Sequence, residues 1–182
     1  MASIAGGGLV LEIAQPEIDI AALVETYSRL LFRVAHSVLR SQAEAEDVVQ
    51  DVFVRVIERH RSLHAIRDMR VWLIRIAWNL ALDRGRRIRP AQLDENFAES
   101  LAAHTMPADE KLSEAERMKA VLREMERLPK AERHVLLLSA VEELGTAEMA
   151  KVIGRSESAV RALLFRARSR LRERLEARGG ER

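Results

Sequence analysis

Residues 146–164 place the strongest constraint on the fold, because their spacing is typical of two short helices joined by a tight turn. Ala150 is small enough for two helices to cross closely, and Gly154, four residues later, suits the left-handed conformation that such a turn requires. Ser156 is a natural N-cap, since its hydroxyl can accept a hydrogen bond from a free amide of the next helix. The segment therefore predicts a helix-turn-helix with a second, DNA-facing recognition helix.

The recognition helix has an apolar side and a basic side. Its apolar residues recur at three- and four-residue steps and predict one buried stripe, made of Val160, Leu163, Leu164, Ala167, Leu171 and Leu175. Residues 151–178 hold nine basic side chains against three acidic ones, so phosphates are the expected counter-charge. A solvated arginine-rich helix is the alternative for the charge run alone, but the turn spacing favours DNA. The candidate DNA contacts are Arg155, Ser156, Ser158, Ala159, Arg161, Ala162, Phe165 and Arg166.

Composition supports a globular helical protein. The chain has 182 residues, of which 48% are hydrophobic and 32% charged, enough for one good core or two small ones. Cysteine is absent, which excludes disulfides and thiolate metal sites and fits a reducing cytoplasm. No apolar run approaches the ~20 residues that span a bilayer, so we expect no membrane insertion.

Periodicity divides the chain into two helical parts. Apolar residues recur at helical spacing before position 87 and after position 112, whereas the stretch between them contains prolines, small residues and acidic residues without an apolar face. We expect an all-α fold of two small helical domains joined by a flexible linker. The expected division is a flexible tail over 1–17, a first domain over 18–87, a linker over 88–111, a second domain over 112–178 and a tail over 179–182.

Local signals mark where several helices begin. Ser41 and Glu44 form a capping-box pattern, in which Ser41 caps the helix and Glu44 reaches back to the cap residue. Asp68 is the expected cap of a later helix, and Pro129 marks the start of another. In the helix after Asp68, we expect the inward side to hold Trp72, Leu73, Ile76 and Leu80.

Three blocks in order resemble the extracytoplasmic-function (ECF, group 4) sigma factors of bacterial RNA polymerase. Residues 46–55 are similar to the region 2 segment with which that family docks on polymerase, and residues 72–84 to its segment that reads the −10 promoter element. Residues 128–133, the helix-turn-helix and residues 166–172 resemble region 4, which binds the −35 element. The resemblance covers about residues 20–87 and 118–176 and implies three partners: core RNA polymerase (its clamp and flap), promoter DNA and an inhibitory anti-sigma factor.

The resemblance also assigns candidate residues in the first domain. The docking face contains Asp47, Gln50, Asp51 and Val54, which lie off the apolar stripe of their helix; an ordinary solvated face is the alternative. Asn79 is placed near the pocket for a flipped-out promoter base, with Trp72 packing beneath it. The implied −10 contacts are Trp72, Arg75, Trp78, Asn79, Arg84, Arg86 and Arg87.

Trp78 departs from the family pattern, which usually has a smaller or basic residue at this position. One hypothesis is that its ring stacks on an unpaired base. The other is that it belongs to the core or faces a partner. The sequence supports both equally.

Other functional classes fit less well. An enzyme would need a phosphate loop, a nucleophile elbow or carboxylates in an apolar pocket, and none is evident, so we expect no catalytic residue and no cofactor. His60 and His64 are four residues apart but lack a third metal ligand nearby, and His36, His104 and His134 are isolated. A stand-alone dimeric helix-turn-helix regulator remains the main alternative, although it has no need of the two region 2 blocks. A sigma-like decoy that binds only an anti-sigma factor is disfavoured by the arginines in both DNA-facing segments.

Overall fold

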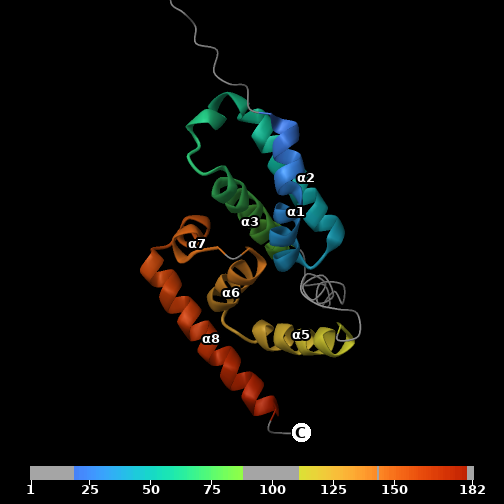
Figure 1. Ribbon diagram of the computed structural model, residues 1–182, viewed down its shortest axis with the longest axis vertical. Helices are drawn as coiled ribbons and strands as arrows, with labels where there is room; N and C mark the ends of the chain where they lie inside the picture. Colours follow the sequence, from blue (N-terminus) through green and yellow to red (C-terminus); the bar gives the residue numbers. More distant parts are fainter. Residues whose placement is uncertain (1–18, 88–110, 143, 180–182) are drawn as a thin grey trace, which may run out of the picture.

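The computed structural model describes residues 19–87, 111–142 and 144–179, and every element in these ranges is helical (Figure 1). The predicted all-α class is therefore confirmed, with two helical units. The predictions for residues 1–17, for positions 88–110 of the linker and for residues 180–182 lie outside the described residues, as does His104.

The first unit is built from three α-helices and one short 3-10 helix. Asp19 caps the first helix, Ser41 the second and Asp68 the third, through side-chain oxygens that accept from Ala22, Glu44 and Val71 backbone N–H groups at 3.1, 3.4 and 3.0 Å. The predicted caps Ser41 and Asp68 are thus confirmed. The elements are α1 (Ile20–Leu39), α2 (Gln42–Glu58), η1 (His60–Ala65) and α3 (Met69–Arg87).

The second unit contains the predicted helix-turn-helix. Gly154 ends the first helix of the motif in the left-handed conformation, with φ of 74°. Ser156 accepts from the Ala159 N–H at 3.3 Å and caps the recognition helix, as predicted. Another helix begins directly after Pro129, also as predicted. The elements are α5 (Lys111–Glu126), α6 (Lys130–Glu142), α7 (Thr146–Ile153) and α8 (Glu157–Gly179).

The set of buried residues on α3 differs from the predicted set. Leu73 is fully buried, but Trp72, Ile76 and Leu80 are only partly buried. The reason is that α3 contacts α1 and α2 on one side and α7 of the second unit on another, so its buried surface is wider than a single stripe. The positions of α3 that are buried are Val71, Leu73, Ile74, Ala77, Trp78 and Ala81.

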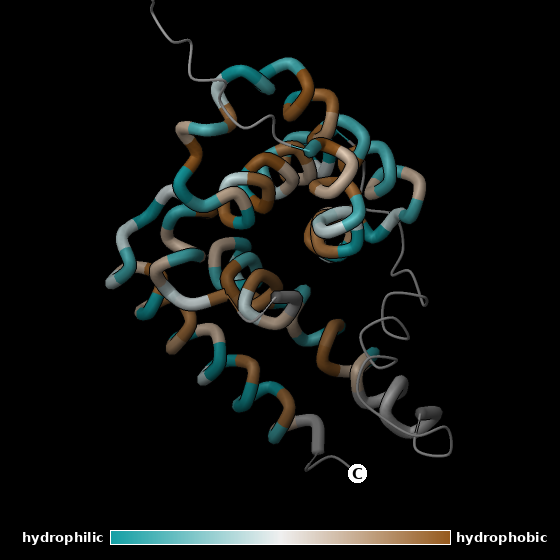
Figure 2. The backbone as a smooth tube through the Cα atoms, turned by 45° about the horizontal axis from the view of Figure 1, so that its top comes forward, coloured by the Kyte–Doolittle hydropathy of each residue, from teal (hydrophilic) through white to brown (hydrophobic). Residues whose placement is uncertain are grey.

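The two units pack against each other. α6 lies against α1 and α7 against α3, while α8 follows α7 along the outer side of the second unit (Figure 1). Apolar and polar positions alternate along the helices (Figure 2). The buried apolar side chains of both units form one cluster. Among the described helices, none has the length and apolar character needed to cross a membrane.

Candidate nucleic-acid interface

The outer face of α8 presents the predicted −35 contacts. Val160, Leu163, Leu164 and Ala167 are buried against the rest of the second unit, which leaves the opposite face open. Ala159 is only half exposed, and Phe165 is the most exposed large apolar side chain among the described residues, at 73%. The remaining candidates are all exposed, namely Arg155, Ser156, Ser158, Arg161, Ala162 and Arg166.

A buried carboxylate anchors the recognition helix on α6. Glu132 is 4% exposed, and its Oε1 accepts from Arg170 at 2.8 Å, with Arg166 Nε at 3.8 Å. Its Oε2 has no hydrogen-bond partner among the described residues. Both arginines stay about half exposed, so they hold α8 in place and still offer charge to a phosphate.

Along α3, most of the predicted −10 contacts are accessible. Arg75, Asn79, Arg86 and Arg87 are exposed, and Arg86 also pairs with Asp83 at 3.3 Å. Trp72 is half buried at the edge of the core.

Trp78 lies between the two units and is 1% exposed. Its ring meets the His134 imidazole of α6 edge to face, with centroids 5.3 Å apart and planes at 87°. Of the two hypotheses for this residue, the core or partner-facing position is the one that the structure shows. A base could stack on Trp78 only after α6 had moved away.

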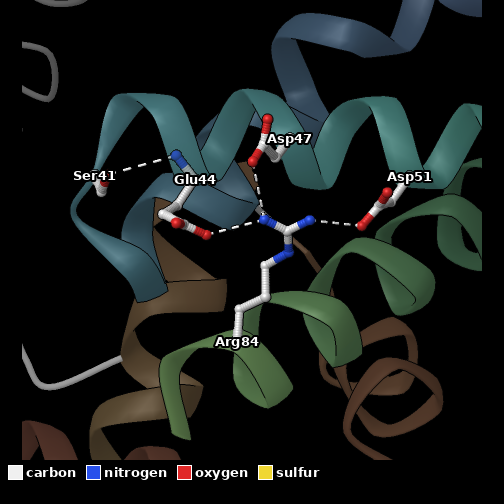
Figure 3. A network of polar contacts seen from close by, with 5 residues as sticks. All are labelled: Ser41, Glu44, Asp47, Asp51 and Arg84. Carbon is white, nitrogen blue, oxygen red and sulfur yellow. Dashed lines mark hydrogen bonds and ion pairs between the residues drawn. The ribbon is translucent and has the colours of Figure 1, made fainter. Parts of the chain in front are cut away.

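Arg84 is held by three carboxylates of α2 (Figure 3). Its Nη1 donates to Glu44 at 2.9 Å and to Asp47 at 3.2 Å, and its Nη2 donates to Asp51 at 2.8 Å. The hydrogen bond with Asp51, followed by those with Glu44 and Asp47, raises the guanidinium pKa above its usual range in spite of burial. Arg84 therefore joins α3 to the acidic face of α2 instead of pointing into solvent, unlike the other arginines predicted to contact the −10 element.

This cluster also changes the expected role of Glu44. Ser41 caps α2, but the Glu44 carboxylate accepts from Arg84 on another helix. One sequence signal could have revealed the cluster: Glu44, Asp47 and Asp51 recur at steps of three and four, which places three acids on one face of a helix. Such a face needs a cation, and the arginines at the end of α3 are candidates.

The predicted docking face on α2 extends beyond the three acids that bind Arg84. Gln50 and Val54 are exposed as predicted, Asp47 and Asp51 keep about half of their side-chain surface open, and Ile57 adds apolar surface. Beside Gln50, a groove of about 520 Å³ lies between α1 and α2. α2 thus presents acidic, amide and apolar groups on one accessible side.

The described residues contain no cluster of three His, Asp or Glu side chains suited to a metal ion. His60 Nδ1 lies 3.0 Å from the Ile57 carbonyl, and His36 stacks on Phe32 at 5.3 Å.

Comparison with known proteins identifies both units. The model of Sigma-70 region 2 matches residues 23–90, and that of Sigma-70, region 4 matches residues 118–171. The ECF RNA polymerase sigma factor SigM of Mycobacterium tuberculosis is 30% identical over 155 residues, which cover 82% of this chain and 73% of that protein. The chain belongs to the ECF sigma factors.

Two further relatives agree with this membership. The probable RNA polymerase sigma factor RfaY of Xanthomonas campestris is 34% identical over 146 residues, which are 78% of this chain but only 36% of that protein. The solved structure of CnrH in complex with the cytosolic domain of CnrY matches with a TM-score of 0.63 and 28% identity, over 87% of this chain and 88% of that one. Sigma factors are not enzymes. Membership in this family also argues against the alternative of a stand-alone dimeric helix-turn-helix regulator.

Proposed function

We propose that this sigma factor binds core RNA polymerase in the cytoplasm, directs it to promoters and is held inactive by an anti-sigma factor. In this proposal, region 2 comprises α1–α3 and docks on the clamp through Asp47, Gln50, Asp51 and Val54. Region 4 comprises α5–α8, and its recognition helix reads the −35 element while it contacts the polymerase flap. The observation that carries the proposal is the presence of both DNA-facing surfaces and the α2 face in one sigma-type fold.

Charge and exposure support the division of roles. The outer face of α8 is basic and open, as phosphate binding requires, and the exposed end of α3 carries Arg86 and Arg87 about two turns beyond the exposed Asn79. The α2 face is acidic and apolar, which suits a protein surface and repels DNA. Regulation of this sigma factor by a separate protein is supported by its similarity to CnrH, whose structure was solved in complex with the cytosolic domain of CnrY.

Run-off transcription with purified core polymerase and a genomic promoter library tests the proposal. We expect specific transcripts only when the chain and core polymerase are both present, because two short DNA-reading segments give little affinity until polymerase holds them at a fixed spacing. Nanomolar binding of the chain alone to a palindromic operator, as a dimer, would contradict it.

A matched pair of substitutions tests the docking face. Val54 on α2 and Val24 on α1 are both exposed valines, at 51% and 37%. Val54→Asp should weaken co-purification with core polymerase about tenfold or more, as expected for a central interface residue, whereas Val24→Asp should not. Equal retention of both variants would remove α2 from the interface.

A further inference from the structure

We propose that the buried carboxylate of Glu132 sets the register of the recognition helix on DNA, by holding Arg166 and Arg170 of α8 in place for phosphates beside the −35 element. Arg170 is thereby added to the DNA contacts, whereas Glu132 is a positioning residue that acts through the two arginines. This inference rests on the proposed function, because it applies only if α8 reads promoter DNA.

Two buried acids face a row of arginines along α8. Arg166, Arg170 and Arg174 follow one another at four-residue steps, so they lie on one side of the helix, about 6 Å apart along its axis. Glu132 Oε1 on α6 lies 3.8 Å from Arg166 Nε and 2.8 Å from Arg170 Nη1. Glu124 Oε2 on α5 lies 3.9 Å from Arg174 Nη1, and both acids are 4% exposed. The row is therefore held from the inside by carboxylates of its own unit.

The burial of Glu132 confines the two arginines that it pairs with. A buried carboxylate is unfavourable unless it is paired and hydrogen-bonded. Glu132 Oε1 has the two guanidinium groups, whereas its Oε2 is buried and has no hydrogen-bond partner among the described residues. If Arg170 moved into solvent, Glu132 would lose its 2.8 Å hydrogen bond and leave a less compensated charge inside the unit. Both arginines are therefore restricted to the neighbourhood of Glu132.

The outer atoms of both arginines remain available to a phosphate. The side chains of Arg166 and Arg170 are 51% and 47% exposed. A guanidinium carries five N–H donors, and the hydrogen bond to Glu132 occupies only an Nη1 donor of Arg170. Because these side chains are already ordered, binding a phosphate sacrifices less conformational freedom than it does for a mobile arginine. One guanidinium can thus bridge Glu132 and a phosphate.

Arg161 differs from these two arginines. Its partner Glu157 keeps 41% of its side chain exposed, and an exposed pair of this kind opens easily. Arg161 also lies five residues before Arg166, which places it on another side of α8. In protein–DNA complexes, phosphate contacts fix register and orientation, whereas base contacts read the sequence. The arginines held by Glu132 serve the first task, and the mobile Arg161 serves the second.

Glu132→Gln tests the positioning role, because it keeps the shape of the side chain and removes its charge. In promoter-binding titrations with the holoenzyme, the ratio of the affinities for the preferred and for a scrambled −35 element should fall about fivefold or more, the lower end of what one bidentate base contact contributes. Affinity for the scrambled element should not fall, since the variant removes a negative charge near DNA. Glu173→Gln is the control: it removes the same charge from an exposed position of α8 and should leave the ratio unchanged. A merely structural Glu132 would lower the melting temperature without changing the ratio.

Arg170→Gln tests the phosphate contact separately. Its amide can still donate to Glu132 but carries no charge, so binding to both templates should weaken equally, and the slope of log affinity against log salt should become shallower by about 1. Arg170→Lys, which retains the charge, should retain the slope. Arg127→Gln is the control, because Arg127 pairs with the buried Glu124 at 3.1 Å but follows α5 and does not belong to α8. It should leave the slope unchanged.

Circular dichroism shows whether each variant keeps its helices. If Glu132→Gln does not fold, Glu132→Asp replaces it, since the shorter side chain keeps the charge but cannot reach the arginines equally well, and its ratio should also fall. An unchanged ratio in the folded Glu132 variant, or an unchanged salt slope in Arg170→Gln, would overturn the proposal. A native holoenzyme that prefers no −35 element over a scrambled one would instead contradict the proposed function.

Discussion

Arg161 is the side chain on which we expect −35 selectivity to depend most. It lies in the second turn of α8, is 63% exposed and pairs with Glu157 at 3.1 Å. An exposed pair of this kind is worth at most about 1 kcal/mol, so Arg161 can leave Glu157 for a guanine. Arg161→Ala should weaken binding of the holoenzyme to its preferred −35 element by about 1–3 kcal/mol and scarcely affect a scrambled one. Promoter-binding titrations on the two templates measure the difference.

Arg172→Ala is the matched control, since it removes the same charge from an exposed position farther along α8. It should weaken binding to both templates equally. If Arg161→Ala behaves in the same way and reduces the salt dependence of binding, Arg161 contacts only phosphate.

Substitution of Asn79 tests DNA reading separately from polymerase docking. Its side chain is exposed on α3, close to Arg75 in sequence, whereas the acids of α2 bind Arg84. Asn79→Ala should preserve polymerase docking but reduce promoter opening, because extruding a base costs a few kcal/mol that its pocket must offset. A template with the −10 base pair already mismatched should recover part of the activity. Permanganate footprinting on both templates measures the opening, and normal melting of the duplex by the variant would exclude this role.

Among the elements, α2 and α3 are joined by Arg84 more than by any other polar contact described. Its three partners are partly exposed, so each ion pair contributes at most about 1 kcal/mol. Arg84→Met should lower the free energy of unfolding of the chain by about 1–2 kcal/mol and weaken polymerase docking, since the acids of α2 then repel one another. Thermal denaturation and co-purification with core polymerase check both effects.

Arg87→Met is the control for Arg84→Met, because Arg87 is exposed on the same helix and forms no ion pair with the residues that the structure describes. It should change the salt dependence of promoter binding and leave stability unaltered. If Arg87→Met lowered stability and Arg84→Met changed only the salt dependence of promoter binding, Arg84 would be a DNA contact instead.

Helix starts were predictable from sequence, whereas the contacts between helices were not. Ser41, Asp68 and Ser156 each accept from an amide three residues away, so a local pattern contains the whole interaction. Trp78 and Arg84 depend on partners that are distant in sequence, and a single apolar stripe cannot describe a helix buried on two sides. The exposed face of α8 was predictable because one side of it meets only its own domain.

At the scale of the whole molecule, His134 makes the contact between α3 and α6 sensitive to pH. Burial, and then the positive charges of Arg133 and Lys130, lower its pKa to about 4 from an ordinary value of 6.5. On the facing helices the nearby groups are Trp78 of α3 and, at the end of α1, Arg40, which is close enough to Arg133 for its own pKa to be lowered by burial and by that charge. The folded chain therefore disfavours protonated His134.

The direction of the pH effect follows from these values. Well above pH 6.5 the imidazole is neutral in the folded and in the unfolded chain, and the stability of the contact does not vary with pH through His134. Between about pH 6.5 and 4, His134 of the unfolded chain binds a proton that the packed His134 does not, so the folded chain loses stability as the pH falls. The melting temperature should accordingly fall more between pH 7.5 and 5.5 in the native sequence than in His134→Phe, which keeps a ring but cannot titrate. Equal falls in the two proteins would exclude His134 as a source of the pH dependence.

The burial of Trp78 between two domains also has a consequence for how the chain melts. Because the two regions share one apolar cluster, heat should unfold them in a single cooperative transition, with the calorimetric and van't Hoff enthalpies equal. Trp78→Ala should divide the endotherm into two, one for each region, since neither then depends on the other.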